Sequence, residues 1–252
     1  MVEVLCIVQA RLTSERLSNK VLLPLGDSGI SLLEHVFYRL QKVQKIDKLV
    51  FAIPDTPSNL QLAMFLDDKN IPYCVGSEND VLDRFWKTAI QEHPKLIVRA
   101  TCDNPLVDWE LVDALIDKLE DSDWISCDET PLGTAVEVFT MNALSEAYRQ
   151  TTDKALREHV TPYIWQKMKS KKIYWNDFQY RLTVDEPKDF ELMNSIYNAL
   201  YRGEPIPNSL VYGYLQENPK IARMNQSIHQ KIIVNEKNGI FITDYQHFDE
   251  AK

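Results

Sequence analysis

Glycine is scarce in this sequence: only seven of the 252 residues are glycine, whereas soluble proteins average about 7%. A glycine-rich loop that cradles phosphate with backbone amides is therefore not expected, and a phosphate site must be built mainly from side chains. Cysteine forms no metal-binding pattern, because there is no CxxC pair and no histidine at zinc-ligand spacing. We interpret the cysteines as small apolar side chains in a reducing compartment; they are Cys6, Cys74, Cys102 and Cys127.

A surplus of positive charge is also missing. The formal net charge is −9 at pH 7, whereas a surface that binds nucleic acid needs a concentrated excess of lysine and arginine. The apolar run at the amino terminus is too short to span a bilayer, and it lacks the basic start and small-residue cleavage site of a signal peptide. We therefore expect no nucleic-acid partner, no membrane partner and a cytoplasmic location.

What the sequence does contain is an alternation of strands and helices. Apolar runs rich in β-formers alternate with segments whose apolar residues recur every three or four positions. The predicted strands cover residues 2–9, 48–53, 72–76, 96–100 and 123–127, and the predicted helices cover 32–43, 60–66, 79–93 and 109–119. This order predicts a three-layer α/β fold with a mainly parallel sheet between helices.

The alternation loosens after residue 134. The pattern there predicts strands at 135–139 and 181–185, and helices at 142–148, 157–168, 187–202 and 207–218. Asn238-Gly239 separates two apolar runs within 231–243 and predicts a hairpin. We expect residues 1–203 to form one domain, and residues 204–252 to form a helical and hairpin extension packed on it or on a partner subunit.

A cluster of basic residues follows the first predicted strand. Arg11, Arg16 and Lys20 lie within ten residues, with Ser14 between them. Ligands of open α/β sheets bind at the carboxyl ends of the strands, and arginine forks with a mobile lysine suit phosphate oxygens. The segment fits a triphosphate site, although its spacing is equally consistent with a solvated basic loop.

Two acidic residues follow other predicted strands. Asp103 comes after strand 96–100, and Asp185 ends strand 181–185. Pro187 and Asp189 already supply the signals for the start of the next helix, which leaves Asp185 available for a metal. Two carboxylates in one crevice suit a Mg²⁺ ion that neutralises a triphosphate. For Asp103 the alternative is an ordinary turn-capping role.

Six ordered blocks together resemble a known family: QARLTSERLSNKVLLPL, GSENDVLDRF, VRATCDNPLVD, VEVF, REHVTPYI and LTVDEPKDFEL. They are similar to the cytidylyltransferase family that contains spore coat polysaccharide biosynthesis protein SpsF, related to the acylneuraminate and 3-deoxy-manno-octulosonate cytidylyltransferases. The resemblance covers roughly the first 200 residues. It implies a nucleotide-diphospho-sugar transferase (Rossmann-like) fold. It also implies a Mg²⁺-dependent enzyme that transfers CMP from CTP to an acceptor and releases pyrophosphate. The acceptor would be a sugar acid of nonulosonate or 3-deoxy-octulosonate type. The product would serve surface polysaccharide or glycan synthesis.

The resemblance further implies roles for individual residues. The triphosphate would be held by Arg11, Ser14, Arg16 and Lys20, and Mg²⁺ (or Mn²⁺) by Asp103 and Asp185. The catalytic set would be Arg16, Lys20, Asp103 and Asp185. Residues on the nucleotide side would be Asp83, Arg84 and Arg99, and residues facing a small-molecule acceptor would be Glu137, Arg157, His159 and Tyr163. Taken alone, a single helical histidine such as His159 is more often structural. Related enzymes are commonly dimeric, so a homodimer is expected.

The sequence departs from the family pattern at three places. Thr13 stands where the family usually has glycine, Ser18-Asn19 stands where it has Pro-Gly, and Ala135 replaces an acid. The changed loop keeps every charge but loses conformational freedom. Two other functions therefore stay open: nucleotidyl transfer to a phosphorylated sugar or polyol, and a catalytically inactive CTP-binding regulatory protein. A glycosyltransferase is disfavoured because CDN at Asp103 supplies no DxD motif.

Overall fold

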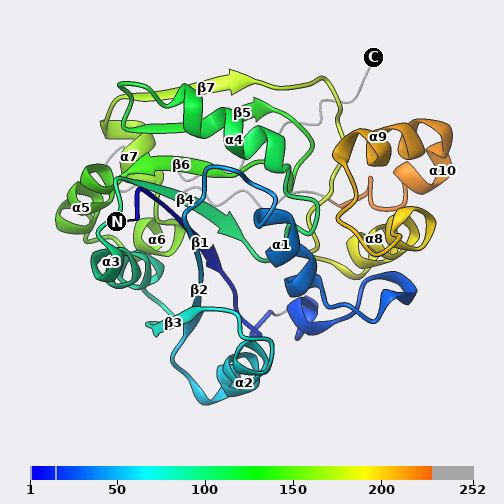
Figure 1. Ribbon diagram of the computed structural model, residues 1–252, viewed down its shortest axis with the longest axis horizontal. Coiled ribbons are helices and arrows are strands. Elements are labelled where there is room, and N and C mark those ends of the chain that lie inside the picture. The colour runs from blue at the N-terminus through cyan, green and yellow to red at the C-terminus, as the bar shows by residue number, and fades with distance from the viewer. Residues whose placement is uncertain (1, 15, 229–252) are drawn as a thin grey trace.

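A computed structural model describes residues 2–14 and 16–228, and it shows a central sheet between two layers of helices (Figure 1). The strand order in the described sheet is β3-β2-β1-β4-β6-β5-β7. The bounds are β1 Val4–Gln9, β2 Lys48–Pro54, β3 Tyr73–Gly76, β4 Leu96–Thr101, β5 Trp124–Glu129, β6 Glu137–Thr140 and β7 Ser170–Tyr174. Only the pairs made by β6 are antiparallel among these strands. The predicted mainly parallel α/β fold is confirmed.

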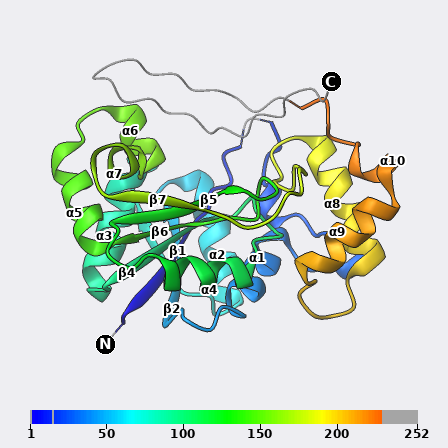
Figure 2. The ribbon, with the colours of Figure 1, turned by 90° about the horizontal axis from the view of Figure 1, so that it is seen from above.

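Helices cover both faces of the sheet (Figure 2). One face carries α1 Leu32–Leu40, α2 Leu60–Asp68, α4 Trp109–Lys118, α8 Pro187–Leu200 and α9 Asn208–Glu217. The other carries α3 Val81–Glu92, α5 Met141–Gln150 and α7 Pro162–Lys167, with α6 Lys154–His159 packed on α3. Short 3₁₀ helices span Lys20–Leu22, Gly26–Ser28 and Pro57–Asn59, and α10 Pro219–Ala222 follows α9.

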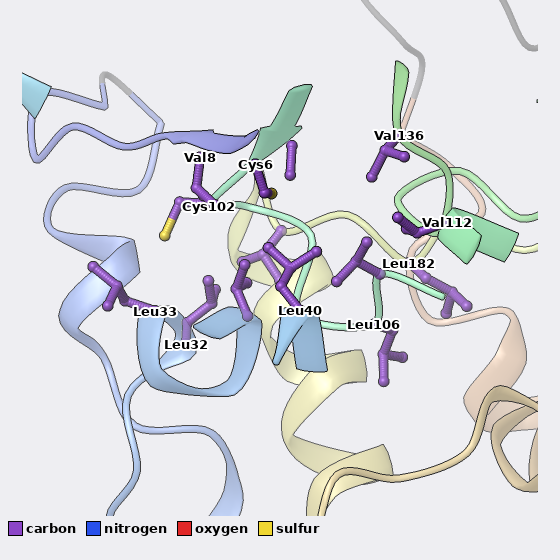
Figure 3. Packing of buried hydrophobic residues seen from close by; sticks show 14 of the residues in the cluster. Cys6, Val8, Leu32, Leu33, Leu40, Cys102, Leu106, Val112, Val136 and Leu182 are labelled. Carbon is purple, nitrogen blue, oxygen red and sulfur yellow. The ribbon is translucent and has the colours of Figure 1, made fainter. Parts of the chain in front are cut away.

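The apolar residues of the sheet point alternately into two separate cores. Cys6 and Val8 of β1 face the core under α1, where Leu32 and Leu40 meet them (Figure 3). Leu5 and Ile7 of the same strand face the core under α3, α5 and α7. Because helices cover both faces of the sheet, the sequence of β1 is a nearly continuous apolar run. Each fully buried leucine or isoleucine contributes about 1.5–3 kcal/mol relative to exposure.

The cysteines behave as the sequence predicts for three of the four. Cys6, Cys102 and Cys127 are buried and free, and Cys74 is free but only half-buried. Burial raises the pKa of the Cys127 thiol to about 11. These thiols are therefore neutral packing groups at physiological pH.

Residues 181–185 do not form the predicted strand. The amide of Leu182 donates to the carbonyl of Leu132 (2.7 Å), while the amide of Val184 donates to the carbonyl of Asp103 (2.8 Å). Successive inward-facing residues thus bond to two different loops instead of one neighbouring strand. Leu182 and Val184 are both fully buried, which explains the alternating pattern that predicted a strand.

Two further elements differ from the prediction. Ser170–Tyr174 forms β7, which the sequence did not indicate because two of its five residues are lysine. It is a strand at the edge of the sheet and pairs with β5, and such edges tolerate lysine. The helix predicted at 157–168 is two helices, α6 and α7, because Val160 between them has a left-handed φ of 69°.

The region after residue 203 joins the main core as far as it is described. Val211, Tyr212 and Leu215 of α9 are buried in the same cluster as α8. The buried Arg39 of α1 donates to the carbonyl of Ile206 (2.5 Å) and to the carbonyl of Val107 (2.8 Å). The domain boundary at 203 stays a prediction, and the hairpin predicted at 231–243 lies outside the described residues. Within the described ranges, no helix has the length and apolar character needed to cross a membrane.

Candidate active site

Lys20 lies between two carboxylates that are far apart in the sequence. Its Nζ is 2.9 Å from Oδ1 of Asp185 and 3.4 Å from Oδ2 of Asp103. It also donates a hydrogen bond of 2.7 Å to the carbonyl of Val184. The residue is only 7% exposed. The basic segment and the two predicted acids therefore converge on one point.

The register of the sheet brings these segments together. Gln9 of β1 pairs with Thr101 of β4, so the segments that leave both strands start side by side at the carboxyl edge. The amide of Asn19 donates to the carbonyl of Leu12 (3.2 Å), which folds the segment back on itself. Lys20 is thereby returned to the strand ends, where Asp103 lies.

The altered loop residues have defined conformations. Asn19, at the position where glycine is usual, has φ 56° and ψ 17°, the left-handed region that glycine favours and asparagine tolerates. Thr13 donates from Oγ1 to Oε1 of Glu78 (2.9 Å), which ties the loop to the segment after β3. The substitution at Asn19 thus keeps a backbone conformation suited to glycine.

Asp185 is held by residues on both sides of it in the sequence. Nη2 of Arg181 lies 3.2 Å from Oδ2 of Asp185. The buried Asp189 accepts hydrogen bonds of 3.0 Å from the amides of Asp185 and Glu186. Asp189 therefore serves the start of α8, as predicted, and the carboxylate of Asp185 is not used as a helix cap.

Arg16 completes the acidic and basic cluster. Its Nη1 donates to Oε1 of Glu186 (2.8 Å), and its Nη2 lies 3.5 Å from Oδ1 of Asp185. One third of the Arg16 side chain is exposed, in contrast to Lys20. Two of the three cations predicted to bind triphosphate, Arg16 and Lys20, are thus paired with acids in this structure.

Burial opposes charge in this cluster, but the attraction between the partners prevails. Desolvation alone lowers the pKa of Lys20, yet the carboxylates of Asp103 and Asp185 raise it above its ordinary value. Burial likewise pushes the pKa of Asp103 upward, and the Lys20 ammonium with the Thr101 hydroxyl holds it below its usual range. Lys20 and Asp103 are therefore both charged at neutral pH.

A second concentration of positive charge lies at Arg11 and Arg84. Arg84 is 3% exposed; its Nη1 donates to the carbonyl of Ser77 (2.7 Å) and its buried Nε has no partner in the described structure. Burial and the nearby charge of Arg11 lower the pKa of Arg84 to about 10. Two guanidinium groups whose charges repel each other favour an anion beside them.

Ser14 lies in the same loop as Arg11, and its backbone carbonyl accepts a hydrogen bond from Oγ of Ser18 (3.3 Å).

Arg99, predicted on the nucleotide side of the cleft, and Glu137, predicted to face the acceptor, are direct partners. They lie opposite each other on β4 and β6 and form an ion pair. Nη2 of Arg99 also donates to Oε1 of Gln9 (3.1 Å). Glu137 accepts from Oγ1 of Thr161 (2.6 Å) and Nε1 of Trp124 (3.1 Å). The two residues thus form one polar network across the sheet, and their ligand-binding roles stay predictions.

Asp83 and Arg157 belong to what we term the α3–α6 network, made of Asp80, Asp83, Tyr148, Thr151 and Arg157. Arg157 donates to Oδ2 of Asp80 (2.8 Å) and to the carbonyl of Thr151 (2.8 Å), and its guanidinium lies 5.0 Å from the centre of the Tyr148 ring. Asp83 accepts from the Tyr148 hydroxyl (3.0 Å). The network joins α3, α5 and α6, a structural role that the sequence analysis did not predict. The substrate roles of both residues stay predictions.

His159 and Tyr163 lie at the junction of α6 and α7. Both are half-buried, and the Tyr163 ring packs against Leu156. Their predicted contact with the acceptor stays a prediction.

Arg181 and Glu186 are site residues that sequence reasoning missed. Arg181 lies four residues before Asp185, and Glu186 lies immediately after it. A basic residue four positions from a candidate ligand is a usable signal only within a helix. Because 181–185 is not helical, only the three-dimensional structure identifies the Arg181 contact.

Asp103 and Asp185 suit a divalent cation. Carboxylate oxygens are the donors that Mg²⁺ prefers, and the ion commonly takes one or two of them together with phosphate oxygens and water. The Lys20 ammonium lies between the two acids, which shows that this point attracts positive charge. No larger group of three or more His, Cys, Asp or Glu side chains is placed to hold a metal in residues 2–14 and 16–228.

Known proteins match this chain in sequence over most of their own length. A family model described as cytidylyltransferase matches residues 5–206. Uncharacterized protein MJ1063 of Methanocaldococcus jannaschii is 35% identical over 241 residues, which is 91% of this chain and 97% of that protein. Spore coat polysaccharide biosynthesis protein SpsF of Bacillus subtilis is 33% identical over 238 residues, covering 88% of this chain and 98% of SpsF.

The architecture also matches a solved structure. A cytidylyltransferase from Leptospira borgpetersenii aligns with a TM-score of 0.83 at 24% identity, covering 91% of this chain and 100% of that one. The fold is therefore the nucleotide-diphospho-sugar transferase fold predicted from the sequence.

Proposed function

The chain belongs to the cytidylyltransferase family, and on this basis we propose that it transfers CMP from CTP to a sugar acid and releases pyrophosphate. The acceptor would be of the nonulosonate or 3-deoxy-octulosonate type, and the product would serve the synthesis of a surface polysaccharide or glycan. The 33% identity to SpsF supports the link to polysaccharide.

One observation carries the proposal: Lys20 joins Asp103 and Asp185 at the carboxyl ends of β1 and β4. Transfer of a nucleotidyl group needs cations for the triphosphate and acids for a metal in the same place. Arg16 adjoins this cluster, and the Arg11–Arg84 pair supplies further positive charge. The cations and acids that support the proposal come from four distant stretches of the chain.

Asp103 and Asp185 would hold Mg²⁺, with Mn²⁺ as a substitute. When bound, the ion neutralises charge on the triphosphate oxygens. Lys20 and Arg16 would then exchange their carboxylate partners for phosphate oxygens. Neither side chain has to travel far, because both already lie against the acids at 3.5 Å or less.

In the proposed reaction an acceptor oxygen bonds to the α-phosphorus while the bond from that phosphorus to the bridging oxygen of the β-phosphate breaks. Lys20 and Arg16 would take up the charge that gathers on the departing pyrophosphate. Arg11, Ser14, Asp83, Arg84 and Arg99 would hold the nucleotide and the remaining phosphates. His159 would bind or deprotonate the acceptor hydroxyl. It would act beside the other acceptor-facing residues Glu137, Arg157 and Tyr163.

The decisive experiment is a pyrophosphate-release assay with each nucleoside triphosphate and a panel of sugar acids and sugar phosphates. We expect release with CTP and a sugar acid, and a product mass that corresponds to one phosphate. A product with two linked phosphates would identify a phosphorylated acceptor instead. Tight CTP binding without pyrophosphate release for any acceptor would identify an inactive CTP-binding protein.

We further propose that the protein works as a homodimer in the cytoplasm. This follows the prediction made from the family resemblance. Sedimentation velocity at micromolar concentration tests the dimer, and a mass equal to one chain would contradict it.

A further inference from the structure

Asn225 lies beyond residues 5–206, the part matched by the family model, yet it touches the residues that hold Asp185. The side chain is 2% exposed. Its Nδ2 donates to Oδ1 of Asp189 (2.8 Å) and to the carbonyl of Arg181 (2.9 Å). A segment outside the family match is thus hydrogen-bonded to the supports of a proposed metal ligand.

Asp189 and Arg181 form a buried ion pair with two contacts. Asp189 is fully buried, and its two oxygens lie 2.9 Å and 3.0 Å from Nε and Nη2 of Arg181. A buried pair of this kind stays favourable only with good geometry and with its other lone pairs satisfied. Asn225 supplies a hydrogen bond to the same oxygen that receives Nε of Arg181.

The ion pair of Arg181 and Asp189 also contacts Asp185 and orients it. Nη2 of Arg181, which bonds Asp189, also lies 3.2 Å from Oδ2 of Asp185. The other oxygen of Asp189 accepts the backbone amide of Asp185. Both the backbone and the carboxylate of Asp185 are therefore oriented by groups that contact Asn225.

We infer that Asn225 is a positioning residue for the metal site, and that the described part of the extension, residues 204–228, contributes to that site. The inference rests on the proposed function, since it takes Asp185 to be a metal ligand. Without the Asn225 amide, a buried carboxylate loses one donor and Arg181 loses a constraint on its backbone. Residues that support metal ligands in this way typically change metal affinity by about 10–100-fold.

Asn225→Ala tests the inference, with Asn218→Ala as the matched control. Asn218 lies in the same extension and donates from Nδ2 to the carbonyl of Tyr214 (2.8 Å) at the end of α9, away from Arg181 and Asp189. Mn²⁺ affinity of the full chain is measured by electron paramagnetic resonance with a non-hydrolysable CTP analogue. We expect Asn225→Ala to weaken Mn²⁺ binding by about tenfold and to lower kcat, without a change in the acceptor KM. Asn218→Ala should match the wild type in these three quantities.

A second measurement works without metal or substrate. Hydrogen exchange at the amides of Asp185 and Glu186, both bonded to Asp189, should be about tenfold faster in Asn225→Ala than in the wild type or the control. If Asn225→Ala does not fold, Asn225→Ser keeps one donor and should give an intermediate effect. Wild-type exchange and wild-type Mn²⁺ affinity in a folded Asn225 variant would overturn the inference.

The two proposals fail in different ways. A wild-type protein that binds neither Mn²⁺ nor the CTP analogue contradicts the proposed function. Exchange at Asp185 and Glu186 still tests the Asn225 contact in that case, and an unchanged rate there would remove the inference as well.

Discussion

Two charged clusters in this protein use the same residue types in different ways. In the active-site cluster, Lys20 bridges Asp103 and Asp185. In the α3–α6 network, Arg157 pairs with one acid, Asp80, and its Nη1 donates to the backbone carbonyls of Tyr148 and Thr151. Both clusters join distant segments. Only the first places two carboxylates against one cation at the carboxyl ends of strands.

The difference lies in what else each carboxylate must do. Asp80 caps α3, because its Oδ1 accepts the amide of Asp83 (2.9 Å). Asp185 lies one residue farther from its helix, because Glu186 is the N-cap of α8, and Asp189 accepts the amides of both residues. A carboxylate before a helix becomes available for a ligand when a neighbour takes over the capping role.

The largest expected effect is on pyrophosphate release, and it distinguishes the acids of the active-site cluster from an acid of the α3–α6 network. Asp103→Asn and Asp185→Asn should each lower pyrophosphate release by about 10² or more, because each removes a charge from the proposed metal site. Asp80→Asn, the matched change in the α3–α6 network, should alter turnover only a few-fold while it lowers the melting temperature. Near-normal pyrophosphate release by either active-site variant would remove the proposed metal site.

Substitution of a cation at each cluster should produce almost as large a difference in turnover. Lys20→Ala should reduce turnover by about 10² and weaken CTP binding, since the proposed triphosphate loses a nearby charge. Lys87→Ala, which removes an exposed partner of Asp83, serves as the control and should change neither. Steady-state kinetics with CTP and acceptor varied separately measures both. A change confined to the acceptor KM would show that Lys20 does not bind the triphosphate.

A pH series probes a buried group that belongs to neither cluster. His35 is 2% exposed; burial lowers its pKa to about 4, with a further decrease from Arg39 against an increase from Glu34. The His35 imidazole is therefore protonated near pH 6.5 in the unfolded chain, but it stays neutral at that pH in the native state. Its contribution to stability is complete above that pH and is lost as the pH falls toward 4.

Between pH 7.5 and 5 this linkage should remove about 2 kcal/mol of unfolding free energy. Urea unfolding of the wild type and His35→Gln at both pH values measures it, with the variant showing the shallower decline. Parallel declines in the two proteins would mean that His35 does not remain neutral in the fold.

The smallest effect concerns Arg157, for which the structure and the family resemblance suggest different roles. Arg157→Lys keeps the charge but loses the fork that bonds Asp80 and two carbonyls, so unfolding free energy should fall by about 1 kcal/mol. At saturating acceptor, turnover should stay within a few-fold of the wild type. A rise of about tenfold in acceptor KM with unchanged stability would instead place Arg157 at the acceptor.

The residues proposed to be catalytic were predictable in part because of where they lie along the chain. Arg16, Lys20 and Asp103 follow strands whose apolar runs mark them clearly, and the carboxyl ends of such strands meet at one edge. Asp185 was selected for a partly wrong reason, since residues 181–185 are not a strand. The alternation of apolar and polar residues there belongs to a segment whose amides bond to two loops, and no local pattern distinguishes such a segment from a strand.

The supports of the site were beyond prediction. Asn225 donates to the carbonyl of Arg181, 44 residues away, and to Asp189, 36 residues away, and such contacts leave no periodic signal. The same holds for the α3–α6 network, in which Arg157 and Asp80 are 77 residues apart.

The sequence alone determined the α/β order of strands and helices, because burial on both faces imposes periodic apolar patterns that can be read locally. It also determined the family, since six ordered blocks are preserved along the chain. Only the tertiary structure decided which acids share Lys20 and which cap a helix. Charged side chains carry no periodicity of their own, and their partners depend on where distant backbones meet.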